Sequence, residues 1–102
     1  MPVITILEAL VDPERTDDLQ AAYAAALQEP FPPGLVHTML LRQATDPTRW
    51  RIETTWQSHE ALADMRRVGG KPRGVQIFEA AGAAPALSIF DAINQAQGRG
   101  AA

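Results

Sequence analysis

The first apolar stretch of the chain, residues 3–11, carries a single charge, at Glu8. Successive side chains of a strand point to opposite faces, so one face would hold Val3, Thr5, Leu7, Ala9 and Val11. The other face would hold Glu8 together with Ile4, Ile6 and Leu10. A strand with one face in water alternates apolar and polar residues, and this one barely does. The pattern therefore predicts a strand that is covered on both faces.

A helix with a single apolar stripe is predicted after this strand. Asp12 can cap the first turn through its carboxylate, and Pro13 fits the first helical position because the N–H there has no helical partner. Apolar residues then recur at helical spacing, at Leu19, Ala22, Tyr23, Ala26 and Leu27. Three prolines and a glycine within residues 30–34 end the helix.

Two further strands are predicted at residues 35–43 and 49–57, joined as a hairpin by a turn at residues 46–48 in a loop of several residues. The second of these strands alternates clearly. One face would hold Trp50, Ile52, Thr54 and Trp56, and the other would hold Arg51, Glu53, Thr55 and Gln57. This polar face is predicted to meet solvent, a dimer interface or a polar cavity.

Two short helices and a last strand complete the pattern. Ser58 is expected to cap the first helix, and Gly69 with the glycine after it is expected to end it. A second short helix is predicted at residues 75–81 and a strand at 85–93. Residues 95–102 have little to pack and are predicted to form a frayed tail.

The order β-α-β-β-α-α-β predicts an α+β fold, a ferredoxin-like four-stranded antiparallel sheet with helices on one face. Residues 1–94 are expected to form a single domain, because no linker divides the chain. The helices of one protomer would cover only one face of the sheet. The apolar character of the other face therefore predicts a homodimer.

Composition excludes several classes of protein. The chain has no cysteine, which excludes disulfides, thiol catalysis and cysteine-ligated metals. Its net charge of −3 gives no reason to expect nucleic acid binding. The N-terminus lacks the basic start and apolar core of a signal peptide, and no apolar run approaches the ~20 residues of a membrane helix. We expect a cytoplasmic protein that binds neither nucleic acid nor a membrane.

Residues 50–62, which read W-R-I-E-T-T-W-Q-S-H-E-A-L, resemble the third strand, the turn and the second helix of a known family. This is the antibiotic biosynthesis monooxygenase (ABM) family of the dimeric α+β barrel superfamily. The opening strand with its Asp-Pro helix start, and residues 75–90, carry the rest of the resemblance. It implies a homodimer in which two sheets pack face to face. It also implies a cofactor-independent monooxygenase that oxidises a small aromatic, quinol-like or polyketide-like substrate with molecular oxygen.

The same resemblance includes a branch that degrades haem. In that branch an Asn on the first strand, a Trp on the second helix and a haem-ligating His carry the reaction. Here the first strand has no Asn, the second helix carries Met65, and residues 66–83 contain no His. We therefore expect no haem, and we expect no other cofactor or metal ion.

His37 is the candidate catalytic base. Oxygenation of a phenol without a cofactor needs a base or polar anchor in an apolar pocket. His37 lies among apolar residues of the second predicted strand, so we expect it to be partly buried. The alternative is a hydrogen-bonded structural histidine at the dimer interface. His59, just after Trp56, either reaches the mouth of a pocket or is an exposed side chain of the first helical turn.

The remaining substrate-binding candidates are Trp56, Met65, Phe78 and Arg73. The first three could pack on a flat aromatic ring, although core packing is the usual role of such residues. Arg73 lies in the glycine-rich segment 69–74 and could close over an anionic group, or it could be solvated.

Glu8 is unusual because it interrupts an apolar strand. A buried carboxylate would have a raised pKa and could act as an acid or base. The alternative is an ion pair with Arg42 or Arg51 across the sheet.

Two other functions remain open. The protein could be a non-catalytic dimeric barrel that binds a small apolar metabolite, because no catalytic signature is present. It could also be an isomerase or cyclase on the same fold. Oxygen uptake with a phenolic substrate would separate a monooxygenase from both.

Overall fold

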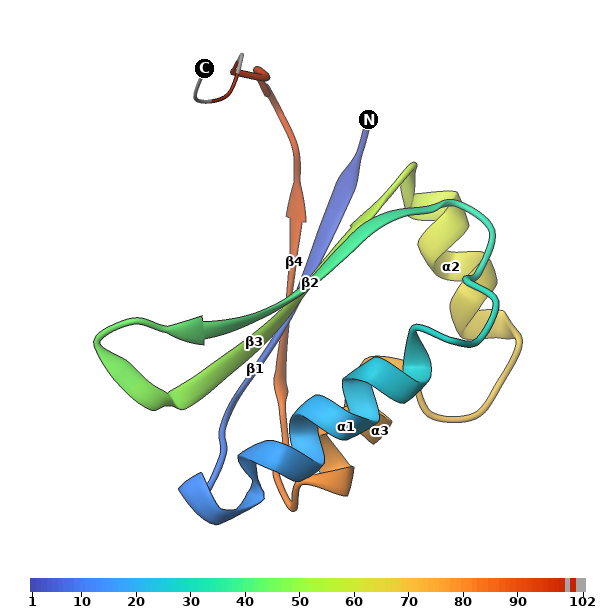
Figure 1. The fold of residues 1–102 in the computed structure, drawn as a ribbon. Helices are drawn as coiled ribbons and strands as arrows, with labels where there is room; N and C mark the ends of the chain where they lie inside the picture. Colours follow the sequence, from blue (N-terminus) through green and yellow to red (C-terminus); the bar gives the residue numbers. More distant parts are fainter. Residues whose placement is uncertain (99, 101–102) are drawn as a thin grey trace.

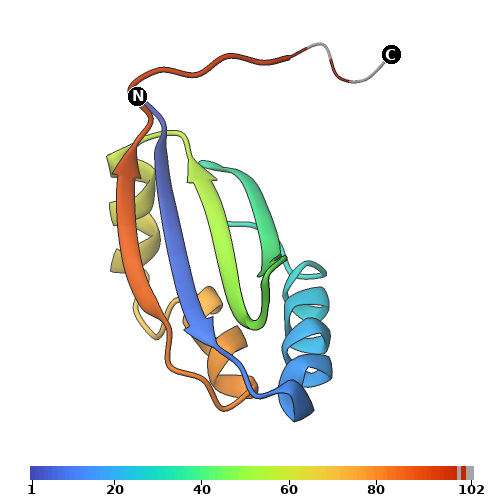
Figure 2. The same cartoon turned by 90° about the vertical axis from the view of Figure 1, so that its left-hand side faces the viewer.

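The computed structural model describes residues 1–98 and 100 and has an antiparallel sheet with the strand order β2-β3-β1-β4. The strands are β1 (Val3–Leu10), β2 (Leu35–Gln43), β3 (Asp46–Trp56) and β4 (Ala86–Asp91). The helices are the 3-10 turn η1 (Pro13–Arg15), α1 (Thr16–Ala26), α2 (His59–Arg67) and α3 (Arg73–Ala80). All helices lie on one face of the sheet (Figures 1 and 2). The predicted α+β, ferredoxin-like architecture is confirmed.

The predicted tail, residues 95–102, is described at 95–98 and 100, where the chain forms neither helix nor strand. For residues 99, 101 and 102 the prediction lies outside the described residues.

The helix starts follow from their caps. The Asp12 carboxylate accepts the backbone N–H of Glu14 (3.1 Å), but this cap opens the 3-10 turn, and α1 itself begins at Thr16. The predicted cap of α2 is confirmed, since the Ser58 hydroxyl accepts the N–H of Ala61 (3.1 Å). None of the helices in the described part of the chain is long and apolar enough to cross a membrane.

The hairpin between β2 and β3 is tighter than predicted. Gln43 pairs directly with Asp46, so the loop is only residues 44–45, and the predicted turn at residues 46–48 is wrong. The Asp46 carboxylate accepts both the hydroxyl (2.6 Å) and the backbone N–H (3.1 Å) of Thr48. These hydrogen bonds, the hydroxyl one foremost, lower the pKa of Asp46. They stabilise the extended start of β3 where a turn was expected.

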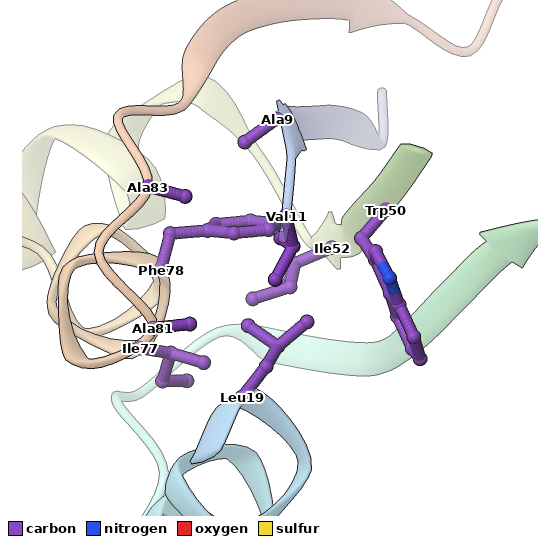
Figure 3. Close-up of a cluster of buried hydrophobic side chains, with 9 residues drawn as sticks. All are labelled: Ala9, Val11, Leu19, Trp50, Ile52, Ile77, Phe78, Ala81 and Ala83. Atoms are coloured by element: carbon purple, nitrogen blue, oxygen red, sulfur yellow. The ribbon is translucent and has the colours of Figure 1, made fainter. Parts of the chain in front are cut away.

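The core lies between the sheet and the helices in two clusters. The larger cluster (Figure 3) joins α1 and α3 to the sheet and contains Ala9, Val11, Leu19, Trp50, Ile52, Ile77, Phe78, Ala81 and Ala83. The smaller cluster anchors α2 and contains Val3, Trp56 and Leu62. α2 lies apart from α1 and α3, which are side by side (Figures 1 and 2). The two clusters therefore anchor different helices to the sheet.

The other face of the sheet, which we call the outer face, is covered by no helix of the described chain. It carries Ile4, Ile6, Leu10, Met39 and Phe90, of which Leu10 is 60% exposed and Phe90 52%. The predicted cover on both faces of β1 is thus not reached within one chain. It stays a prediction that depends on a partner.

Candidate functional site

A cavity of about 980 Å³ lies on the helix face of the sheet, between the two core clusters. Its size is at the upper end of the range typical of small-molecule sites. Helices α1, α2 and α3 contribute to the walls. Residues 29–33, after α1, and residues 68–72, between α2 and α3, also form part of the walls. The sheet forms the floor with Thr5, Leu7, Thr38, Ile52, Thr54 and Trp56.

Three threonines form a row across this floor, which we call the threonine row. The strand register pairs Thr38 with Thr54, and Thr54 with Thr5, so all three side chains share the helix face of the sheet. Tyr23 on α1 donates its hydroxyl proton to Thr38 (3.3 Å), and the Thr38 and Thr54 hydroxyls are 3.2 Å apart. At the other end, the Trp56 indole N–H donates to Thr5 (3.1 Å). The floor is therefore apolar except for one ordered strip of hydroxyls.

The rim of the cavity carries its charges. Arg73, the first residue of α3, lies 3.4 Å from the Glu29 carboxylate and donates to the carbonyl of Pro30 (3.3 Å). These contacts hold the segment after α1 against α3. Lys71 pairs with Glu79 at 2.9 Å. The charged residues that line the cavity, three basic and two acidic, are Arg66, Lys71, Arg73, Glu29 and Asp64.

Of the residues predicted to bind substrate, Trp56, Met65 and Arg73 line this cavity. Phe78 does not. Its ring is fully buried in the larger core cluster and points toward Val11 (Figure 3). Phe78 therefore has the alternative role given for it above, which is packing in the hydrophobic core.

Neither histidine reaches the cavity. His37 pairs with Thr55 on the outer face and is exposed within one chain, so its expected partial burial stays a prediction that depends on a partner. Its apolar neighbours in sequence alternate with it, and Leu40 packs on the helix side. His59 is 63% exposed at the start of α2, where its Nε2 lies 2.5 Å from a carboxylate oxygen of Asp91. The structure brings neither side chain to the site where Trp56 and Met65 lie.

Glu8 has the structural role considered above. Its carboxylate lies 3.6 Å from the guanidinium groups of both Arg49 and Arg51, so the predicted pair with Arg51 is confirmed. Arg42 instead lies over the ring of Trp50, 5.7 Å from its centroid. Within residues 1–98 and 100, no group of three or more metal-binding side chains comes together.

Four residues of the site were not identified as functional from the sequence: Tyr23, Thr5, Thr38 and Thr54. The helical spacing places Tyr23 in an apolar stripe, and the strand patterns alone give the three threonines no role beyond that of ordinary strand residues. The available signal was a threonine on the inward face of each of three strands. Recognising the row would have required the register that aligns them.

Comparison with known proteins agrees with this fold. The family model for antibiotic biosynthesis monooxygenase matches residues 2–67, so the chain belongs to the ABM family. No curated protein matches the chain significantly.

Several solved structures share the fold at low sequence identity. SnoaB, a cofactor-independent oxygenase from Streptomyces nogalater, is 19% identical with a TM-score of 0.67, over 92% of this chain and 95% of its own. Rv0793 from Mycobacterium tuberculosis is 19% identical with a TM-score of 0.68, over 95% of this chain and 100% of its own. A Caulobacter crescentus protein proposed to be an antibiotic biosynthesis monooxygenase is 20% identical with a TM-score of 0.68, over 91% of each chain.

Proposed function

We propose that this protein is a cofactor-independent monooxygenase that oxidises a small phenolic, quinol-like or polyketide-like aromatic compound with molecular oxygen. The observation that carries this proposal is the cavity on the helix face, which is apolar except for the threonine row. Such a site holds a flat ring by apolar contact and orients it through a few polar groups. Membership of the ABM family and the shared fold with the oxygenase SnoaB support the same function.

The chemistry needs little from the protein beyond binding and shielding. A phenolate gives one electron to oxygen, the two radicals combine into a hydroperoxide, and loss of water leaves a quinone. One oxygen atom enters the ring and the other leaves as water with two substrate hydrogens, so no external reductant is required. In this proposal Trp56 and Met65 pack against the ring, and Arg73 at the rim holds an oxygen substituent. The apolar walls of the cavity would limit the contact of the bound ring with water.

We also propose that the protein is a homodimer joined through the outer face. Leu10, Met39 and Phe90 leave apolar surface exposed there, and a second copy of the sheet would remove this surface from water. Sedimentation of the wild type should show a dimer, and Phe90→Glu should shift it toward monomer. Phe31 is similarly exposed (50%) but lies in the segment beside the cavity, so Phe31→Glu is the matched control. A monomeric wild type at high protein concentration would refute this assembly.

Oxygen uptake is the assay that tests the proposed reaction. With a panel of hydroquinones and polycyclic phenols, we expect the wild type to consume one oxygen molecule per substrate oxidised. Ala26→Phe places a ring in the cavity and should reduce turnover by about 100-fold, because small displacements of bound substrate have effects of this size. Ala24→Phe, exposed on the same helix, should leave turnover unchanged. His37→Ala should also retain turnover, because this histidine lies on the outer face and does not line the cavity.

The variants separate two accounts of the site. Loss of turnover in His37→Ala, with Ala26→Phe still active, would refute the cavity as the site and restore His37 as the base. Far-ultraviolet circular dichroism of each variant shows whether the fold is intact.

Binding without turnover is the second candidate function. The observation that favours it is that, in the described part of the chain, the only carboxylates lining the cavity are at the rim and no histidine lines it. Saturable binding of an aromatic compound without oxygen uptake would support this function. Conversion of the compound without oxygen uptake would instead indicate an isomerase or cyclase.

A further inference from the structure

The threonine row leaves two hydroxyl protons without an acceptor. A threonine hydroxyl has one proton to donate and can accept two hydrogen bonds. Tyr23 donates to Thr38, and either hydroxyl of the Thr38–Thr54 pair can donate to the other, so Thr38 is free to donate to Thr54. Thr54 then keeps its own proton. Thr5 likewise accepts from the Trp56 indole and keeps its proton. In this arrangement, and among the residues that the structure describes, neither Thr5 nor Thr54 donates to another protein group.

These two hydroxyls lie next to each other at the floor of the cavity. Thr5 and Thr54 are directly opposite on neighbouring antiparallel strands, where Cβ atoms are about 4.5–5.5 Å apart. Thr54 is 8% exposed, Thr5 is half-buried, and both line the cavity. With Thr38 as the donor to Thr54, each of the two hydroxyls also accepts a hydrogen bond, and this polarises its O–H and strengthens it as a donor. The pair is therefore able to donate to one oxygen of a ligand.

The cavity offers hydrogen-bond donors but no evident base. The chain has two histidines, and the structure places both outside the cavity. Its two lining carboxylates are exposed at the rim, where Glu29 lies 3.4 Å from Arg73 and Asp64 lies 2.7 Å from Arg67. The lining charges are three basic and two acidic, an excess of one positive charge. This environment favours an anion over a neutral phenol that must lose a proton inside the site.

We propose that the protein binds its substrate as an anion already formed in water, a phenolate or enolate whose charged oxygen accepts from Thr5 and Thr54. This inference deepens the proposed function, because it takes the cavity as the substrate site. It restricts the substrate to acidic compounds, such as phenols with a carbonyl group on the ring and enolised 1,3-dicarbonyl compounds. The pH dependence of binding then follows the acidity of the substrate and not that of a side chain.

A coloured phenol tests this inference without turnover. 4-Nitrophenol changes its visible absorbance when it ionises, and 4-nitroanisole is the matched ether that cannot ionise. In the presence of saturating protein, the ionisation midpoint of 4-nitrophenol should fall by about one pH unit or more, because hydrogen bonds to a charged group are strong. Binding of 4-nitroanisole should not change with pH over the same range.

Valine variants locate the effect. Thr5→Val and Thr54→Val keep the side-chain shape and remove the donor, so each should weaken phenolate binding about tenfold or more. Neither should weaken 4-nitroanisole binding to that extent. Thr55→Val, one residue along β3 and on the outer face, is the control and should bind as the wild type does. Thermal melts of all three variants check that the fold is retained.

Three results would overturn the inference. One is an ionisation midpoint of bound 4-nitrophenol that is unchanged or raised. Another is Thr54→Val binding the phenolate as tightly as Thr55→Val does. The third is a shared pH midpoint for binding of 4-nitrophenol and the more acidic 2,4-dinitrophenol, which would indicate a protein base. Absence of oxygen uptake together with a clear preference for phenolate would refute the proposed function and leave this inference standing.

Discussion

Replacing Phe78 with alanine is expected to reduce the free energy of unfolding by about 3–5 kcal/mol. The ring is 0% exposed and packs within the larger core cluster that joins α1 and α3 to the sheet (Figure 3). Its removal loses apolar burial and leaves a cavity that the neighbouring backbone elements cannot fill. Domains of this size are stabilised by only about 5–15 kcal/mol, so much of the stability would be lost. Urea denaturation followed by circular dichroism measures the change.

Phe31→Ala is the control for this prediction. Phe31 is 50% exposed, so its loss should change stability by about 1 kcal/mol or less. An equal effect of the two variants would contradict the core described here. A Phe78→Ala protein that kept its stability but lost ligand binding would instead support the ligand contact predicted from the sequence.

Gly34→Ala is expected to destabilise the protein by about 2–4 kcal/mol, for two separate reasons. Gly34 has φ +84°, a conformation that alanine adopts only with strain. A Cβ atom there would also lie 2.4 Å from the Cβ of Ala61 on α2, so the chain before β2 would have to move. The Gly34 carbonyl accepts the N–H of Gln57 (2.8 Å), and that contact would be disturbed. Thermal and urea unfolding measure the loss.

Gly69→Ala separates the two reasons. Gly69 has nearly the same φ, +87°, but nothing lies within 4 Å of the added Cβ. This control should show only the backbone strain, about 1–2 kcal/mol. If Gly34→Ala cost no more than Gly69→Ala, the close approach between this loop and α2 would be refuted.

Local patterns were sufficient for most of the fold. Strand periodicity assigned the faces of β1 and β3 correctly, and the Ser58 cap located the start of α2. The prediction of a turn at residues 46–48 is wrong because it relied on residue type. Asp46, Pro47 and Thr48 are common turn residues, but here they form the start of β3. Here Asp46 uses its carboxylate on Thr48 inside an extended segment.

The site was harder to predict because it depends on register and on open space. The apolar neighbours of His37 in sequence suggested burial, but alternation sends Leu40 to the helix side and His37 to the outer face. Thr5, Thr38 and Thr54 are far apart in sequence and meet only through strand pairing. The cavity itself results from α2 packing apart from α1 and α3, which no periodicity encodes.

In the function proposed here, the ligand binds on the helix face of the sheet. The chain has three methionines, and they report on three places: Met65 lines the cavity, Met39 lies on the outer face, and Met1 is 69% exposed at the N-terminus. Carbon-13 methyl NMR of the methionines during a titration with 4-nitrophenol would locate the ring directly. We predict that the Met65 resonance shifts and that those of Met39 and Met1 do not. A shift of Met39 with Met65 unmoved would place the ligand on the outer face and contradict this account.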